Sequence, residues 1–268
     1  ILRCLVGSEM CIRDRINMDS SVLQDEAFIL HVKNWQTADK YVVCFTKEHG
    51  KLRFIAYGAR YPKNVAGRLL QPFAWLNVDV QQGQKLDKLR SCELCTLPKA
   101  MNIEQMAYGA VVAELTALFT EDKAPQPELY QLLADTFKII LERNPRIVIL
   151  SFAIKLLDLT GFAPQLEQCV SCGREIEDHE DCWFSPLQGG SICTECRQSL
   201  SGDGLEHCAA STREFWRTLA ALDFVQPQHF TVQGSSLMEL EKILLRYIYF
   251  QTDKPLKSMD FIRQLNMK

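Results

Sequence analysis

Residues 41–57 read YVVCFTKEHGKLRFIAY, and this stretch decides the architecture of the amino-terminal part of the chain. Two runs rich in β-branched and aromatic side chains, 41–45 and 52–57, are separated by a polar segment in which His49-Gly50 supplies the turn. Such a pattern is typical of two strands joined as a hairpin. Further strands are expected over 27–32 and over 76–80, where apolar and polar residues alternate.

The region from residue 20 to residue 87 as a whole is expected to hold about five short strands. That number in roughly seventy residues predicts a small barrel, of either the OB or the SH3-like size. The strand periodicity does not choose between the two.

From residue 98 onward the apolar spacing becomes helical. Helices are predicted over 103–119, over 128–142, and from Pro145 to about residue 159. Two more are predicted over 212–222 and 236–251. A polar, cysteine-rich insert separates the two helical blocks, which we expect to pack together as one bundle.

The sequence therefore predicts a multidomain α+β protein. The expected parts are a barrel over 18–97, a helical domain in two pieces over 98–166 and 205–268, and an inserted module over 167–204. Residues 1–17 show neither helix nor strand period, and 4–15 (CLVGSEMCIRDR) resemble a translated sequencing adapter. We therefore expect 1–17 to be a non-native leader.

Composition excludes several classes of protein. The 268 residues are 47% hydrophobic and 24% charged, with a net charge of −3, which is ordinary for a folded globular chain. The longest nearly uncharged apolar run, 147–154, is far shorter than the ~20 residues of a membrane span. Eleven cysteines without the apolar core of a signal peptide indicate a reducing, cytoplasmic compartment.

Four of the cysteines, Cys169, Cys172, Cys193 and Cys196, follow the spacing C-x2-C-x20-C-x2-C. Two tight turns of this kind place four sulfurs around one metal ion, so the pattern predicts a single structural zinc ion with no open position for a catalytic water. The alternatives are a redox dithiol and a site that has lost its metal. The nearby residues His179, Cys182, His207 and Cys208 are expected to serve packing or surface roles.

A second CxxC pair, Cys92 and Cys95, has no matching partner pair. We interpret it as a strand end or a junction between barrel and bundle. Redox or metal chemistry is the alternative.

Basic residues dominate the strand region. Between Lys33 and Arg68 there are eight basic residues against two acidic ones, and aromatic residues are interleaved with them. Cations that follow phosphates, together with rings that stack on bases, are typical of single-strand nucleic-acid binding. Strand alternation places Phe54 in the core and leaves Tyr57 and Tyr61 as the stacking candidates. The alternative is a solvated charged face.

No phosphate-binding loop, dinucleotide fingerprint, HExxH or GxSxG motif occurs in the sequence. The five histidines form no visible catalytic set. We therefore expect that the protein is not an enzyme.

Several stretches together resemble the RecO family of bacterial recombination mediators. The stretches are TKEHGKL at 46–52, YGARYPK at 57–63, LLQPF at 69–73, LLDLTGFAP at 156–164 followed by the CxxC pairs, and FSP at 184–186. The resemblance spans nearly everything from Met18 to the carboxyl-terminal helices.

The resemblance implies an N-terminal OB fold, a helical domain and a zinc module. It implies binding to single- and double-stranded DNA and annealing of complementary strands. It also implies work with RecR, and with RecF in the RecFOR pathway of gap repair, to load RecA on DNA coated by single-strand-binding protein. The implied location is the bacterial nucleoid. The implied DNA contacts are Lys47, Lys51, Arg53, Arg60, Lys63 and Arg68.

In this family the acidic-apolar tail of single-strand-binding protein docks on the helical domain. The segment 236–251, with an apolar face and the cations Lys242 and Arg246, is a candidate groove for it. The alternative is an ordinary amphipathic core helix.

Two competing functions remain on the residues alone. One is a zinc-ribbon adaptor that binds other proteins and has little affinity for DNA. The other is an enzyme that uses Cys92 and Cys95, which requires a thiol of lowered pKa.

Overall fold

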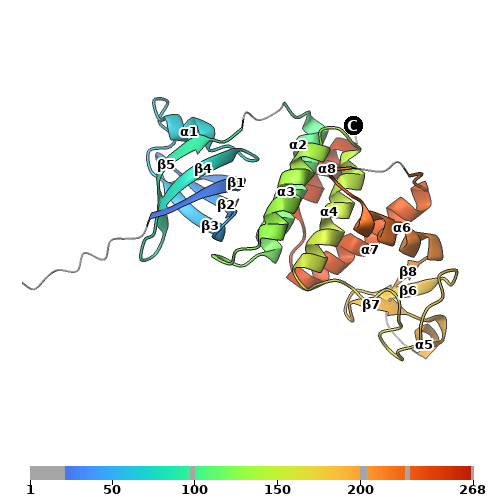
Figure 1. Cartoon of the computed structure of the whole chain (residues 1–268). Helices are drawn as coiled ribbons and strands as arrows, with labels where there is room; N and C mark the ends of the chain where they lie inside the picture. Colours follow the sequence, from blue (N-terminus) through green and yellow to red (C-terminus); the bar gives the residue numbers. More distant parts are fainter. Residues whose placement is uncertain (1–21, 97–99, 200–203, 227–229, 267–268) are drawn as a thin grey trace, which may run out of the picture.

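The computed structural model describes residues 22–96, 100–199, 204–226 and 230–266. The segment expected to be a leader, 1–17, lies outside these ranges. A β-barrel, a helical bundle and a small sheet module follow one another along the molecule (Figure 1). Among the helices of the described residues, none is long and apolar enough to span a membrane.

Five strands close the barrel in the order β1-β2-β3-β5-β4, and a short helix, α1 (Val65–Leu69), connects β3 to β4. All neighbouring pairs are antiparallel except β3 and β5, which run parallel. This order confirms the predicted OB-like barrel over the SH3-like alternative. The strands are β1 (Val22–Trp35), β2 (Asp39–Thr46), β3 (Gly50–Ala56), β4 (Trp75–Gln81) and β5 (Asp87–Leu94).

The barrel interior follows from strand alternation. Phe54 is fully buried, as its position in β3 predicts, and β4 alternates buried with half-buried or exposed residues along its length. The fifth strand, β5, carries too many charged residues to be bounded from its sequence. The largest interior side chains are Ile29, Leu52, Phe54, Leu70 and Leu76.

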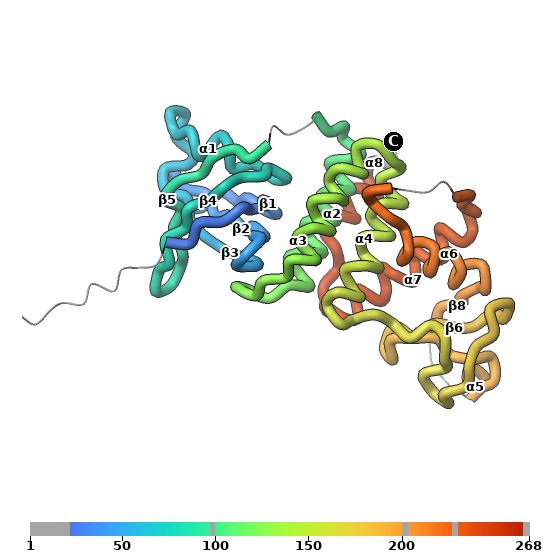
Figure 2. Tube along the Cα trace, viewed as in Figure 1, coloured from blue at the N-terminus to red at the C-terminus, as the bar shows by residue number. Residues whose placement is uncertain are grey.

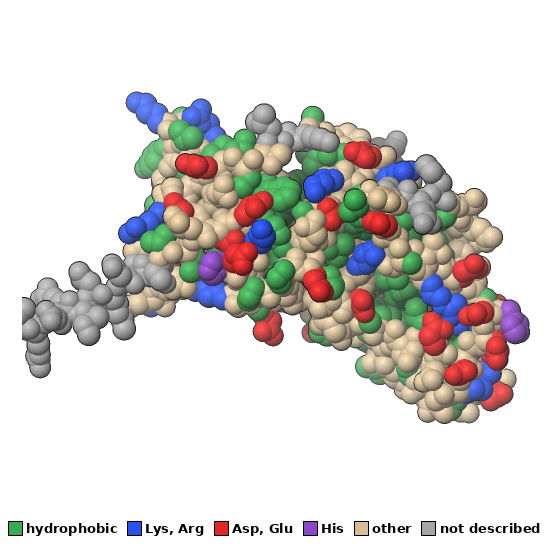
Figure 3. Space-filling view, viewed as in Figure 1, with side chains coloured by type: hydrophobic (Ala, Val, Ile, Leu, Met, Phe, Trp, Pro, Cys, Tyr) green, Lys and Arg blue, Asp and Glu red, His purple; other side chains and the backbone are tan. Residues whose placement is uncertain are grey.

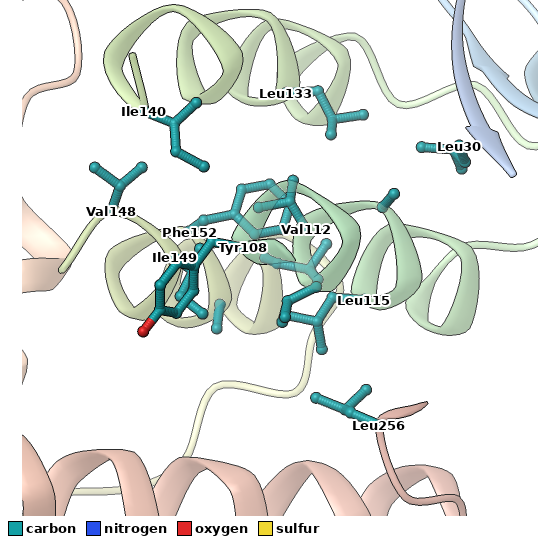
Figure 4. Packing of buried hydrophobic residues seen from close by; sticks show 14 of the residues in the cluster. Leu30, Tyr108, Val112, Leu115, Leu133, Ile140, Val148, Ile149, Phe152 and Leu256 are labelled. Carbon is teal, nitrogen blue, oxygen red and sulfur yellow. The ribbon is translucent and has the colours of Figure 1, made fainter. Parts of the chain in front are cut away.

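The helices form one bundle, as expected. Residues after α7 pack into the same hydrophobic cluster as α2 and α4, and Leu256 shows this in Figure 4. On α2, Glu114 also accepts hydrogen bonds from the backbone N–H groups of Lys257 and Ser258 at the start of α8, a helix the sequence pattern does not predict. The helices are α2 (Ile103–Phe119), α3 (Pro127–Ile139), α4 (Pro145–Leu159), α6 (Ala210–Ala221), α7 (Gly234–Thr252) and α8 (Lys257–Asn266).

The insert is a three-stranded sheet with a short helix, α5 (Thr194–Ser199). Its strands are β6 (Cys182–Ser185), β7 (Gly190–Ile192) and β8 (Glu206–Cys208), in the order β7-β6-β8. The guanidinium of Arg213 in α6 is fully buried and donates to backbone carbonyls of the insert. On β8, Glu206 forms ion pairs with Lys242 and Arg246 of α7. The insert is thus anchored to two helices of the bundle.

The barrel and the bundle meet at an interface, called the seam below, where β3 and Trp75 of the barrel contact the end of α2, the loop before α3, and Tyr130. The ammonium of Lys51 donates to the carbonyls of Ala117 (2.8 Å) and Thr120 at the end of α2. The backbone N–H of Lys123 donates to the carbonyl of Lys51 at 2.9 Å, so the loop after α2 lies alongside β3. The indole N–H of Trp75 donates to the hydroxyl of Tyr130 at 2.8 Å. In Figure 2 the loop before α3 reaches toward the barrel.

The close approach at the seam requires glycine at position 50. Its φ is +68°, and a Cβ there would lie 2.0 Å from the carbonyl oxygen of Ala124. We expect Gly50→Ala to destabilise the protein by more than the about 1–3 kcal/mol of a strained backbone alone. Gly161→Ala is the matched control, because Gly161 has a φ of +79° and open space around it. Urea unfolding measures both; equal losses would show that the seam tolerates the added carbon.

Candidate nucleic-acid interface and metal centre

Four thiols gather where the insert folds back on itself. Cys169 and Cys172 lie in the turn before β6, Cys193 follows β7, and Cys196 lies in α5. Their four sulfur atoms all lie within 4.8 Å of one another, and those of Cys172 and Cys193 are 3.9 Å apart. A tetrahedral zinc site with bonds of ~2.3 Å places its sulfurs about 3.8 Å apart. The four predicted cysteines therefore form a cluster that could hold a metal ion.

Backbone groups support the cluster. The N–H of Cys193 donates to the sulfur of Cys169 at 3.3 Å, and the N–H of Cys196 donates to the sulfur of Cys193 at 3.4 Å. Gly173, with a φ of +77°, closes the first turn by donating to the carbonyl of Cys169. Burial raises the pKa of the Cys169 thiol, but the backbone N–H donors outweigh it and lower that pKa to about 6. The thiolate, the form that binds metals, is thereby favoured.

The chemistry of the donor set fits a cation. Four thiolates this close repel one another, and the hydrogen bonds that the Cys196 thiol donates to the sulfurs of Cys172 and Cys193 favour its protonated form and raise its pKa to about 12. A divalent ion removes this repulsion and leaves no coordination position open. Cys182 and Cys208 face each other across β6 and β8 and are buried outside the cluster, while His179 is exposed.

Loss of one thiol should abolish metal binding. We expect Cys172→Ser to lower bound zinc from one ion per chain to near zero and to increase amide exchange over 169–196, because site formation and local folding are coupled. Elemental analysis and hydrogen exchange measure the two effects. The double variant Cys92→Ser, Cys95→Ser is the control and should keep its zinc; full metal content in Cys172→Ser would contradict the assignment.

The second CxxC pair lies at the end of β5. Burial raises the pKa of both Cys92 and Cys95 to about 11. A thiol of raised pKa is a poor nucleophile at neutral pH. The structure therefore does not favour the competing hypothesis of an enzyme built on this pair.

The raised pKa values predict slow alkylation. Because only the thiolate reacts, the rate of iodoacetamide labelling at Cys92 and Cys95 should rise about tenfold per pH unit from pH 8 toward pH 11. In the urea-unfolded chain the same thiols should react faster and level off near pH 9. Peptide mass spectrometry resolves each site, and rapid labelling of the folded protein at pH 7 would contradict the expectation.

Two of the expected DNA contacts lie at the seam. Lys51 differs from the expectation, because its side chain is only 5% exposed and its ammonium is held by α2 carbonyls and Asp122. Arg53 is half-exposed and pairs with Asp122 at 3.1 Å. Lys47 is exposed in the turn between β2 and β3.

Four of the other expected residues come together at the opposite end of β3, in the loop 57–64. Arg60 and Lys63 are exposed, as are Tyr57 and Tyr61, at 58% and 63%. Arg60 also donates to the carbonyl of Thr37 at 2.9 Å and so ties this loop to the β1–β2 turn. Arg68 is exposed on α1.

Two further residues belong to this end of the barrel. The ammonium of Lys88 on β5 lies 5.8 Å from the ring centroid of Tyr57, and Trp35 at the end of β1 is 38% exposed. The local sequence pattern does not predict that either residue lies on this surface. Lys88 lies in a charged strand, and the direction of Trp35 depends on an irregularity in β1.

Charge is segregated over the molecule. Acidic residues on the outer face of β1, β4 and β5 line a hollow that includes Glu26, Asp79 and Glu93. The stretch 167–208 holds nine acidic and two basic residues. In Figure 3 Lys and Arg side chains project from the end of the barrel farthest from the bundle. A polyanion is therefore attracted to that end and repelled by the insert.

These features define a class: an OB-like barrel with a basic and aromatic end, joined to a helical bundle that carries a four-cysteine site. The family model described as recombination protein O N terminal matches residues 18–98, and the one described as recombination protein O C terminal matches 101–260. The chain belongs to the RecO family of DNA repair and recombination proteins.

The chain is similar to individual relatives over nearly its full length and theirs. DNA repair protein RecO of Symbiobacterium thermophilum is 29% identical over 245 residues, covering 90% of this chain and 96% of the relative. The proteins of the same name from Thermoanaerobacter sp. (strain X514) and Cutibacterium acnes are 29% and 28% identical. They are matched over 98% of their length, and they cover 91% and 90% of this chain.

Proposed function

We propose that this protein is a DNA-binding recombination mediator that anneals complementary strands. Together with RecR, and with RecF in gap repair, it helps to load RecA on DNA coated by single-strand-binding protein. The observation that carries the DNA-binding part is the gathering of Arg60, Lys63, Tyr57 and Tyr61 in one exposed loop of an OB-like barrel. Family membership supports the partners.

Annealing needs no covalent chemistry. Two DNA strands repel each other through their phosphates, and cations at the barrel end reduce that repulsion when they replace the condensed counterions. Complementary bases can then meet, and pairing supplies the driving force. The acidic face of the barrel and the acidic insert keep the strands at the basic end.

A structural zinc ion is proposed at Cys169, Cys172, Cys193 and Cys196. When bound, the ion crosslinks the two turns of the insert. The insert in turn packs on α6 and α7 through Arg213 and Glu206. We therefore assign the metal to folding of the insert and not to contact with DNA.

The proposed domain limits are 18–97 for the barrel, 98–166 and 205–268 for the helical domain, and 167–204 for the zinc module. The change of family model between residues 98 and 101 supports the first limit. The proposed location is the bacterial cytoplasm, at the nucleoid.

The candidate groove for the tail of single-strand-binding protein is not open in this structure. The five apolar residues of α7 that would line the groove are at most 3% exposed, because they form part of the core: Leu240, Ile243, Leu244, Tyr247 and Ile248. Lys242 and Arg246 pair with Glu206. The segment 236–251 is thus the core helix of the alternative interpretation, and the tail is proposed to dock elsewhere on the helical domain.

Salt-dependent binding tests the proposal. We expect single-strand affinity, measured by fluorescence anisotropy, to fall with salt at a slope of about −0.7 per phosphate contact. The triple variant Arg60→Gln, Lys63→Gln, Arg68→Gln should bind more weakly, with a slope less steep by about 2 if all three contact phosphates. It should also anneal complementary oligonucleotides more slowly.

The matched control removes the same charge from the bundle, as Lys254→Gln, Lys257→Gln, Arg263→Gln. These three side chains are exposed in and before α8. The control should bind and anneal like the parent. If both triple variants matched the parent, the barrel end would not be the DNA site.

A further inference from the structure

One half of the outer face of β1 and β2 is covered and the other half is open. Near the seam, Phe28 and Phe45 are paired across the two strands and buried against the bundle. Farther along, Lys33 pairs with Tyr41, and the ring of Trp35 lies 5.8 Å from that of Tyr41. Lys33 and Trp35 are exposed.

A β-bulge turns these residues outward. The register of β1 against β2 shifts between Ile29 and His31. Before the shift the odd-numbered Ile29 points into the barrel, whereas after it the even-numbered Val32 does. Lys33 and Trp35 therefore point outward, although simple alternation from Ile29 would place them inside.

A row of residues on this face runs across four strands; Lys33 and Lys88 at its ends are exposed, whereas Ile55 within it is only 1% exposed. Lys33 on β1 is opposite Tyr41 on β2, Tyr41 is opposite Ile55 on β3, and Ile55 is opposite Lys88 on β5. Residues in one such row share a face, and strands lie ~4.8 Å apart, so the row is roughly 14 Å long. A lysine lies at each end and aromatic side chains lie beside it: Trp35 next to Tyr41, and Tyr57 under Lys88.

The turn that carries Trp35 is held in place. Gln36, next to Trp35, has a φ of +47°. Arg60 donates from its side chain to the carbonyl of Thr37 and from its backbone N–H to the carbonyl of Ala38. The backbone N–H of Gly58 donates to Asp39, which is buried and so presents little negative charge on this face.

We propose that Trp35, Tyr41 and Tyr57, flanked by Lys33 and Lys88, form a stacking platform that makes the barrel prefer single-stranded over double-stranded DNA. The proposal rests on the proposed function and names the form of DNA that the same site selects. An aromatic ring can stack on a base only when the face of that base is free, and in a duplex both faces are covered by neighbouring base pairs. Lysines alone would attract both forms.

Trp35 both stacks on a base of the DNA and reports that contact through its own fluorescence. The other tryptophans lie elsewhere: Trp75 bonds to Tyr130 at the seam, Trp216 is in the core, and Trp183 is in the insert. Single-stranded DNA should therefore quench the intrinsic fluorescence of the parent, and Trp35→Phe should remove that quenching while it keeps most of the affinity. Trp183→Phe is the control and should leave the quenching intact.

Trp35→Ala should weaken single-strand binding by about 5-fold or more, the usual effect of losing one stacked ring, and change duplex affinity by less than about 2-fold. Urea unfolding of each variant checks that the fold is kept. Equal losses for both DNA forms, or full quenching in Trp35→Phe, would overturn the platform while leaving DNA binding at the barrel intact. A parent without salt-dependent DNA affinity would instead overturn the proposed function.

Discussion

A lysine ammonium buried at the end of a helix fixes the arrangement of this molecule. The last carbonyls of an α-helix lack intrahelical partners, and α2 has no basic residue in its own last turn. The barrel supplies the missing cation, because Lys51 donates to two of these carbonyls and pairs with Asp122. Burial lowers the pKa of Lys51, while the charge of Asp122 opposes that shift. The contact therefore holds β3 against the bundle, because the ammonium of Lys51 interacts with two carbonyls and one carboxylate from the bundle side.

This contact decides which part of the barrel is free. With β3 anchored at Gly50 and Lys51, the bundle covers the near half of the outer face of β1 and β2 and leaves the far half open. The bulge after Ile29 then turns Lys33 and Trp35 into that open half. Acidic residues occupy the β4 side of the barrel and the insert. Packing, strand register and charge thus direct a polyanion to the same end.

The sequence predicts the features that depend on local spacing. The helices over 103–119 and 145–159 have the predicted bounds, because Asn102 caps the first and Pro145 opens the second. The four cysteines meet as their spacing requires. The strands β6 to β8 and helix α8 are not predicted, because each is short and depends on packing against the rest of the fold.

Local spacing does not predict contacts between residues that are far apart in the sequence. Lys51 lies in a basic segment and is therefore expected to contact DNA. Its ammonium instead donates to carbonyls that are 66 and 69 residues away in the sequence. Trp35 can be assigned to a face only when the bulge in β1 is known. The apolar pattern of α7 is compatible with a groove as well as with a core helix, and only the burial of its side chains decides between them.

Hydrogen exchange with and without single-stranded DNA tests the central claim most directly, because it reports every segment of the full chain at once. The account predicts that DNA slows amide exchange in 33–41, 57–63 and 85–90, and leaves 167–208 unchanged. Protection confined to the bundle or the insert, with none in the barrel segments, would contradict it.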